Sequence, residues 1–336
     1  MAVTEDDTPV AHPRQVFDFI QGEAQETAFV EALSRGRLHH AWLLCGPEGV
    51  GKATFAYRAA RYLMGHQRDR GFGILGMSEE DPDARLIVAQ SHPDLLVLER
   101  EQKDGKTRKN ITVDAVREVG EFFSKAPSRS AYRVCIVDAV DDLNINSANA
   151  LLKILEEPPE RGLLFLISHS PGKLLATIRS RCRRLGFSPL DDEAVQRFIA
   201  ARADLSPEQL ERLVVMAKGS PGKGLRLWEE GALEMDELAA RLLSEAPPAR
   251  FDLLPLMTMF KTNSSKIDGP KKFAQFIAAL SDRVQERALS ADAPARGRQW
   301  SELWVRLSTV VAETEGVNLD RGEYFWSIVN DIKALR

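Results

Sequence analysis

The stretch GPEGVGKAT, from Gly46 to Thr54, decides the fold of this chain. It follows the apolar run AWLLC and precedes a segment whose apolar residues have helical spacing. A loop of the form G-x-x-x-x-G-K-[S/T] between a strand and a helix cradles phosphates, because its glycines let backbone N–H groups converge and its lysine reaches the terminal phosphates. Gly46, Gly49, Gly51 and Lys52 therefore form a candidate nucleotide-binding loop.

Two positions needed for Mg²⁺ chemistry depart from this pattern. The residue after the lysine normally supplies a hydroxyl to the ion, and here it is Ala53. The run RVCIVD ends in Asp138, the expected place for a metal-linked carboxylate, but Ala139 follows instead of a Glu that would polarise the attacking water. Asp141 and Asp142 are predicted to face elsewhere. We therefore predict a degenerate site that needs no cofactor and binds ATP or ADP weakly at most.

Short apolar runs alternate with amphipathic segments in the first half of the chain. The predicted strands are 40–45, 94–100, 133–138 and 163–168. The predicted helices are 52–64, 112–123 and 146–157. Continuous apolar strands separated by helices indicate a parallel sheet with both faces covered, so the fold class is α/β.

The pattern changes after Pro189, because no convincing strand follows it. Amphipathic helices continue to the end of the chain, including one with Phe273, Ile277, Leu280 and Val284 in line. We predict three domains: an α/β P-loop domain over 1–189, a small helical lid domain over 190–236 and an all-α C-terminal oligomerisation domain over 237–336.

Composition narrows the class of protein. The 336 residues are 44% hydrophobic and 28% charged, as in a soluble globular protein, and the net charge of −4 excludes a uniformly basic nucleic-acid-coating protein. Three widely separated cysteines and no C-x-x-C pair predict neither a disulfide framework nor a zinc ribbon. The polar, acidic N-terminus is unlike a signal peptide, and no apolar run approaches a membrane span. We expect a cytoplasmic protein without a membrane partner.

Further motifs resemble those of bacterial clamp-loader subunits of DNA polymerase III, which belong to the AAA+ superfamily. The resemblance rests on NSANALLKILEEPP, on LLFLISHSPGKLLATIRSRCRRLGF, on SHPDLLVLE, on ITVDAVREV and on KGSPGKGLRL. The tripeptide S-R-C at 180–182 resembles the signature of that family. The resemblance covers about 38–227 well and implies an AAA+ P-loop domain, a helical lid and a helical collar.

The resemblance also implies a role. Motor subunits of the gamma/tau type carry both metal-holding positions, whereas the delta-prime type usually lacks them, so Ala53 and Ala139 favour the delta-prime type. By resemblance, Arg181 is an arginine finger supplied in trans to a neighbouring ATPase subunit. The implied partners are gamma/tau and delta subunits in a hetero-oligomeric ring, the sliding clamp, and primed DNA through the complex. The implied function is that of a stator during clamp loading in replication.

The sequence departs from the family at two more places. Many members hold zinc with four cysteines in the segment that corresponds to 65–90, which contains none here, so no zinc or other metal is expected. Ser-Pro-Gly stands where a sensor arginine belongs, and Lys223 and Arg226 are predicted to be surface charges.

Other interpretations stay open. An active gamma/tau-like ATPase or, less well supported, a nucleotide kinase would explain the loop. A DNA-binding module would explain the basic segments 100–109 and 173–184. If the family resemblance is set aside, the arginines of ATIRSRCRR are interpreted as cations that complement the dipole at the end of a helix.

Overall fold

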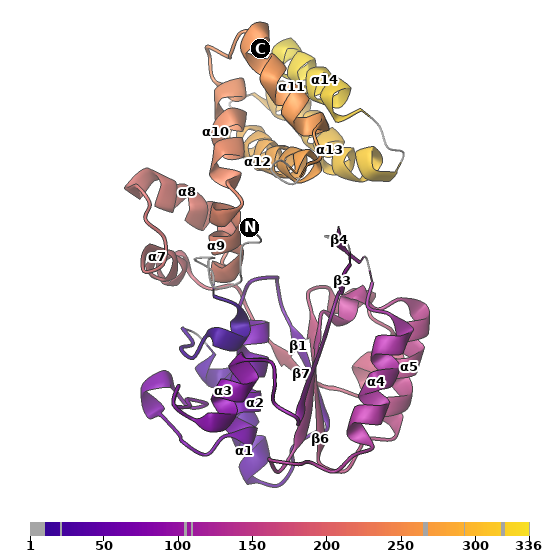
Figure 1. The fold of residues 1–336 in the computed structure, drawn as a ribbon. Helices are drawn as coiled ribbons and strands as arrows, with labels where there is room; N and C mark the ends of the chain where they lie inside the picture. The colour runs from indigo at the N-terminus through magenta and orange to yellow at the C-terminus, as the bar shows by residue number, and fades with distance from the viewer. Residues whose placement is uncertain are drawn as a thin grey trace. The chain divides into compact units, whose positions relative to one another are not determined.

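The protein forms two compact units, Met1–Arg226 and Leu227–Arg336, and the division falls within one helix. The computed structural model describes residues 11–20, 22–103, 106–108, 110–264, 268–291, 293–316 and 320–335. Figure 1 shows the elements of each unit. The division into three domains stays a prediction, because residues 190–226 of the predicted lid belong to the first unit together with the α/β domain.

The first unit alternates strands and helices and ends in three helices. Its elements in chain order are η2 (Pro13–Gln15), α1 (Glu23–Ser34), β1 (Ala41–Cys45), α2 (Lys52–Met64), η3 (Arg70–Phe72), α3 (Pro82–Val88), β2 (Leu95–Glu99), β3 (Gln102–Lys103), β4 (Lys106–Thr107), α4 (Val113–Phe123), β5 (Arg133–Asp138), η4 (Val140–Asp142), α5 (Ile145–Glu156), β6 (Gly162–Ser168), η5 (Pro171–Lys173), α6 (Ala176–Ser180), β7 (Arg183–Gly186), α7 (Asp192–Ala200), α8 (Pro207–Ala217) and α9 (Pro221–Glu229).

The central sheet is parallel, with the strand order β2-β5-β6-β1-β7. Helices α1, α2 and α3 lie on one side of it, and α4 and α5 lie on the other (Figure 1). Cys45 pairs with Ser168 and Asp138 pairs with Ile167, so the carboxyl ends of β1, β5 and β6 meet at one edge. This edge carries the candidate nucleotide loop. The predicted α/β fold with a parallel sheet is confirmed.

The fifth strand, β7, is absent from the predicted elements. Its sequence RRLG lies in the basic run expected at a helix end, but only Ala176–Ser180 is helical there. The strand lies at the sheet edge, and Arg183 and Arg184 are exposed, so no buried apolar run marks it in the sequence.

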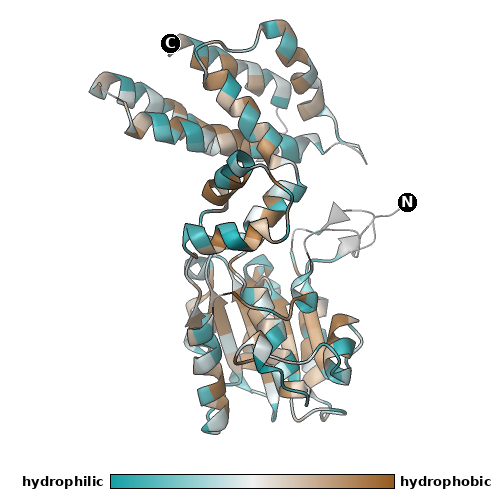
Figure 2. Ribbon diagram, turned by 90° about the vertical axis from the view of Figure 1, so that its left-hand side faces the viewer, coloured by the Kyte–Doolittle hydropathy of each residue, from teal (hydrophilic) through white to brown (hydrophobic). Residues whose placement is uncertain are grey.

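The two faces of the sheet are packed differently. On one face, the Phe29 ring lies 5.3 Å from Trp42, 6.0 Å from Phe55 and 5.8 Å from Phe165 between ring centroids. The other face is aliphatic, with Leu43 in the same cluster as residues of α4 and α5. The strands are accordingly hydrophobic along their length (Figure 2). Burial on both faces explains why the strands read as unbroken apolar runs.

The second unit is helical. Its elements are α10 (Ala232–Leu243), η6 (Arg250–Leu253), α11 (Leu254–Lys261), α12 (Gly269–Leu289), α13 (Pro294–Gly316) and α14 (Arg321–Ala334). Phe273, Ile277, Leu280 and Val284 are all buried in one core cluster, as their helical spacing predicted. Among the described residues of this unit there is one isolated bridge and no strand, in agreement with the predicted all-α fold. No helix in the described part of the chain has the length and apolar character needed to cross a bilayer.

Candidate functional site: a P-loop in contact with the lid helices

The P-loop lies where the sequence predicted, between β1 and α2. Its start is tied to the sheet, because Gly46 N–H donates to the Ser168 carbonyl over 3.3 Å. Gly49 and Gly51 have φ values of +76° and +101°, in the left-handed region that L side chains avoid. These glycines produce the tight turn that brings Lys52 to the first position of α2.

The lysine side chain turns back onto its own loop. Lys52 is only 3% exposed, and its Nζ donates to the Gly46 carbonyl over 2.7 Å and to the Pro47 carbonyl over 2.6 Å. Burial lowers the Lys52 pKa to about 8, although the Asp138 and Glu48 carboxylates act in the opposite direction. Two of the three ammonium donors are therefore engaged within the loop itself.

The metal-holding positions do not fit a magnesium–ATP complex. Ala53 presents a methyl group where Mg²⁺ needs a hydroxyl, and Ala139 stands where the Glu that polarises the attacking water would be. Asp138 ends β5 as predicted, but burial, assisted by the Glu99 charge, raises its pKa to about 6 despite the opposing effect of Lys52. A carboxyl group that protonates so readily is a poor single anchor for a divalent ion.

The two later aspartates have other partners near the same edge of the sheet. Asp141 accepts from Ser168 Oγ over 2.8 Å, from His169 N–H over 2.6 Å and from Ser170 N–H over 3.3 Å. Asp142 forms an ion pair with Arg100 at 3.1 Å. Asp141 thus fixes the end of β6, and neither carboxylate replaces the missing metal ligand.

The first turn of α9 lies directly against the P-loop, a feature that we call the lid–loop contact. Gly222 N–H donates to the Gly49 carbonyl over 2.9 Å. A Cβ atom on Gly49 would lie 2.3 Å from the Lys223 backbone nitrogen, so the two backbones touch. Sequence reasoning missed this contact because Gly49 and Gly222 carry no side chain that could signal it.

An ion pair completes the lid–loop contact. Arg226 Nη1 donates to Glu48 Oε1 over 2.5 Å. Burial acts to raise the Glu48 pKa, but the hydrogen bond and charge of Arg226 lower it below its usual value. Arg226 was predicted to be a surface charge only, whereas it connects the lid to the loop. A sensor arginine is absent at 219–223, as the sequence indicated.

The segment before α1 adds two further contacts around the loop. A Cβ atom on Gly51 would lie 2.9 Å from the Phe19 ring, so this aromatic side chain packs against the loop. Asp18 forms an ion pair with Arg202 of the lid at 2.8 Å. The loop is therefore bordered by this segment as well as by α9.

Arg181 contacts residues of α5 and α6. It follows α6, and its partners are Glu156 Oε1, 2.9 Å from Nη2, and the Thr177 carbonyl, 3.1 Å from Nη1. Its side chain is 36% exposed. Arg183 instead stacks over Trp42 at 4.6 Å from the ring centroid, so the basic run does not act as one uniform cluster.

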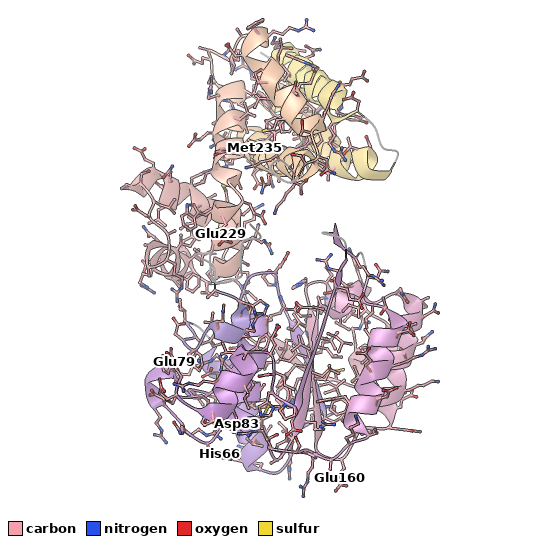
Figure 3. All side chains as sticks on the ribbon, viewed as in Figure 1. His66, Glu79, Asp83, Glu160, Glu229 and Met235 are labelled. Carbon is pink, nitrogen blue, oxygen red and sulfur yellow. The ribbon has the colours of Figure 1, made fainter. Side chains whose placement is uncertain are left out.

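The cysteine-free segment between α2 and α3 is organised by a buried carboxylate. Asp81 accepts from four backbone N–H groups, those of His66, Gln67, Asp83 and Ala84, over 2.8–3.0 Å. Figure 3 labels His66, which lies near the start of the segment, and Asp83, which lies in α3. Within the residues that the structure describes, no three His, Cys, Asp or Glu side chains cluster as metal ligands. The absence of zinc stays a prediction.

Comparison with known proteins places this site in a family. The family model described as DNA polymerase III, delta subunit, matches residues 21–191, just over half of the chain. The chain belongs to this family. The matched region contains the P-loop, Asp138 and Arg181, and it confirms the resemblance of the sequence to subunits of DNA polymerase III.

Several proteins similar to this chain are subunits of DNA polymerase III. The chain is 37% identical to DNA polymerase III subunit delta' of Pseudomonas aeruginosa over 62% of each chain. It is 32% identical to subunit delta' of Escherichia coli over 66% of this chain and 64% of that one. It is 27% identical to subunit tau of Escherichia coli over 96% of this chain and 46% of tau. The matches therefore span less than two thirds of the length of these relatives.

Proposed function

We propose that this protein is a delta-prime-like subunit of a DNA polymerase III clamp loader that does not hydrolyse ATP itself. The observation that carries the proposal is the nucleotide site: Ala53 removes one Mg²⁺ ligand, and Ala139 removes the carboxylate that would polarise the attacking water. In addition, Lys52 donates to loop carbonyls and α9 lies against Gly49. Such a chain acts as a stator, a fixed element against which ATP-driven subunits move. The identity to delta' subunits supports this assignment.

In this proposal the chain contributes to catalysis in trans. Arg181 is an arginine finger that enters the ATP site of a neighbouring motor subunit. A guanidinium there neutralises charge on the transferred phosphoryl group, an effect of about 10³–10⁵ in rate in related systems. The partly exposed side chain, held at the end of α6 by Glu156 and the Thr177 carbonyl, is consistent with this role.

The proposed partners follow from the same role. Gamma/tau and delta subunits would share a hetero-oligomeric ring with this chain through its C-terminal helices. The ring would open the sliding clamp and place it on primed DNA in the cytoplasm. No cofactor is required by this chain, although the loop amides and Lys52 leave weak ATP or ADP binding open to measurement.

The alternative is an active gamma/tau-like ATPase. Its support is the retained Lys52 and the 27% identity to tau along most of this chain. The delta-prime-like proposal is preferred, because Ala53 removes a usual Mg²⁺ ligand and Ala139 removes the carboxylate that would polarise the attacking water.

Reconstitution tests the proposal. The chain is mixed with the gamma/tau and delta subunits of its own organism, and assembly is followed by size-exclusion chromatography with light scattering. Incorporation into one ring, together with DNA- and clamp-stimulated ATP hydrolysis that requires this chain, supports the proposal. Failure to enter any ring, or a ring that turns over equally without the chain, contradicts it.

A further inference from the structure

The side chain of Glu156 holds Arg181 in one place on the surface of the free subunit. Glu156 Oε1 lies 2.9 Å from Arg181 Nη2, and Arg181 Nη1 donates to the Thr177 carbonyl over 3.1 Å. The two terminal nitrogens of the guanidinium therefore have separate partners on two elements. Nε takes part in neither contact.

The backbones that carry the two side chains are themselves anchored. Glu156 is the last residue of α5 and follows Leu155, which is 2% exposed in the core. Arg181 comes three residues after Ile178, which is 1% exposed in the same core cluster. Both side chains start from backbone positions that are fixed by these buried neighbours. The ion pair therefore restricts the orientation of the Arg181 guanidinium.

The Arg181–Glu156 ion pair is too exposed to contribute much to the free energy of folding. The side chains of Arg181 and Glu156 are 36% and 50% exposed. Exposed ion pairs contribute little to folding, since solvent screens them and both side chains lose rotamer freedom. The carbonyl end of α5 does favour a cation at this place. The pair therefore determines where the guanidinium lies more than how stable the fold is.

We propose that Glu156 is a positioning residue for Arg181, an inference that rests on the proposed trans role of that arginine. A guanidinium already held in one orientation loses less conformational freedom when it meets a neighbour's triphosphate. Glu156 does not contact the nucleotide. Its carboxylate fixes the arm, and the N–H groups outside the two intrachain contacts face the phosphates.

A double-mutant cycle in the reconstituted ring tests this inference. Glu156→Ala lowers kcat for ATP about two- to fivefold, the factor that an exposed ion pair supplies when expressed as a rate ratio, with KM unchanged. Glu156→Gln, which keeps an acceptor oxygen, restores part of the loss. Glu157→Gln, the adjacent exposed residue, leaves kcat unchanged as the matched control. In an Arg181→Ala background, Glu156→Ala has no further effect.

The inference is overturned if Glu156→Ala leaves kcat unchanged, or lowers it equally with and without Arg181. If Arg181→Ala itself leaves turnover unchanged, the proposed trans role fails. Whether Glu156 positions Arg181 is then tested on the isolated subunit. There, ¹⁵N relaxation of the Arg181 Nε–Hε group reports its order. Glu156→Ala lowers the order parameter if Glu156 positions the arginine, and an unchanged value contradicts positioning.

Discussion

Substitution of Gly49 by alanine opens the lid–loop contact. Gly49 has φ +76°, and a Cβ atom there would lie 2.3 Å from the Lys223 backbone nitrogen. Left-handed backbone strain costs alanine about 1–2 kcal/mol, and forcing the two backbones apart adds about 1–3 kcal/mol. Gly36 provides the control, because it has φ +62° and a Cβ atom there would have no neighbour within 4 Å, so that Gly36→Ala incurs the strain alone.

Native-state hydrogen exchange at the Gly222 amide measures this opening. That amide donates to the Gly49 carbonyl over 2.9 Å, so its exchange reports the contact directly. A penalty of about 1–3 kcal/mol corresponds to exchange about 5- to 150-fold faster in Gly49→Ala. Gly36→Ala leaves the Gly222 rate unchanged. Equal Gly222 protection in the wild type and in Gly49→Ala would refute the claim that the lid rests on the loop.

Three further outcomes are expected. Arg181→Ala leaves ring assembly intact but lowers turnover at the neighbouring site at least tenfold, as measured by steady-state ATP hydrolysis of the reconstituted ring. Asp81→Asn destabilises the fold by about 2–4 kcal/mol in urea unfolding, because one oxygen becomes an amide that faces two N–H donors, whereas exposed Glu80→Gln has little effect. Burial acts to raise the pKa of Asp94, but hydrogen bonds from Arg129, Ser128 and Ser130 lower it from 3.8 to about 2. Asp94 therefore contributes about 2 kcal/mol above pH 4 that is lost as the pH falls toward 2, and Asp94→Asn removes this pH-dependent component of urea unfolding.

The sequence predicted the elements whose signals are local. Helix α2 and strand β5 have the bounds that the periodicity indicated, Lys52–Met64 and Arg133–Asp138. Thr112 caps α4 as predicted, because its side chain accepts a hydrogen bond from Ala115 N–H. These signals come from apolar spacing and from a capping side chain, which act over a few residues. The candidate loop followed from its glycines and lysine in the same way.

The sequence did not predict features that arise between distant backbones. The contact of Gly49 with Gly222 joins positions far apart in the chain through main-chain atoms, so no residue pattern marks it. Strand β7 was missed because an exposed edge strand needs no apolar run. The pairing of Arg181 with Glu156 depends on the end of α5 meeting the end of α6, which only the packed fold brings about.

The central claim is that this polypeptide does not turn over ATP in its own P-loop, and single-subunit ATPase assays test it most directly. Purified chain is incubated with Mg²⁺ and ATP, and phosphate release is compared with that of Lys52→Ala. The account predicts indistinguishable, background-level release from both proteins, because Ala53 provides no ligand for the ion and Ala139 no carboxylate for the attacking water. Sustained turnover by the wild type that Lys52→Ala abolishes would contradict it.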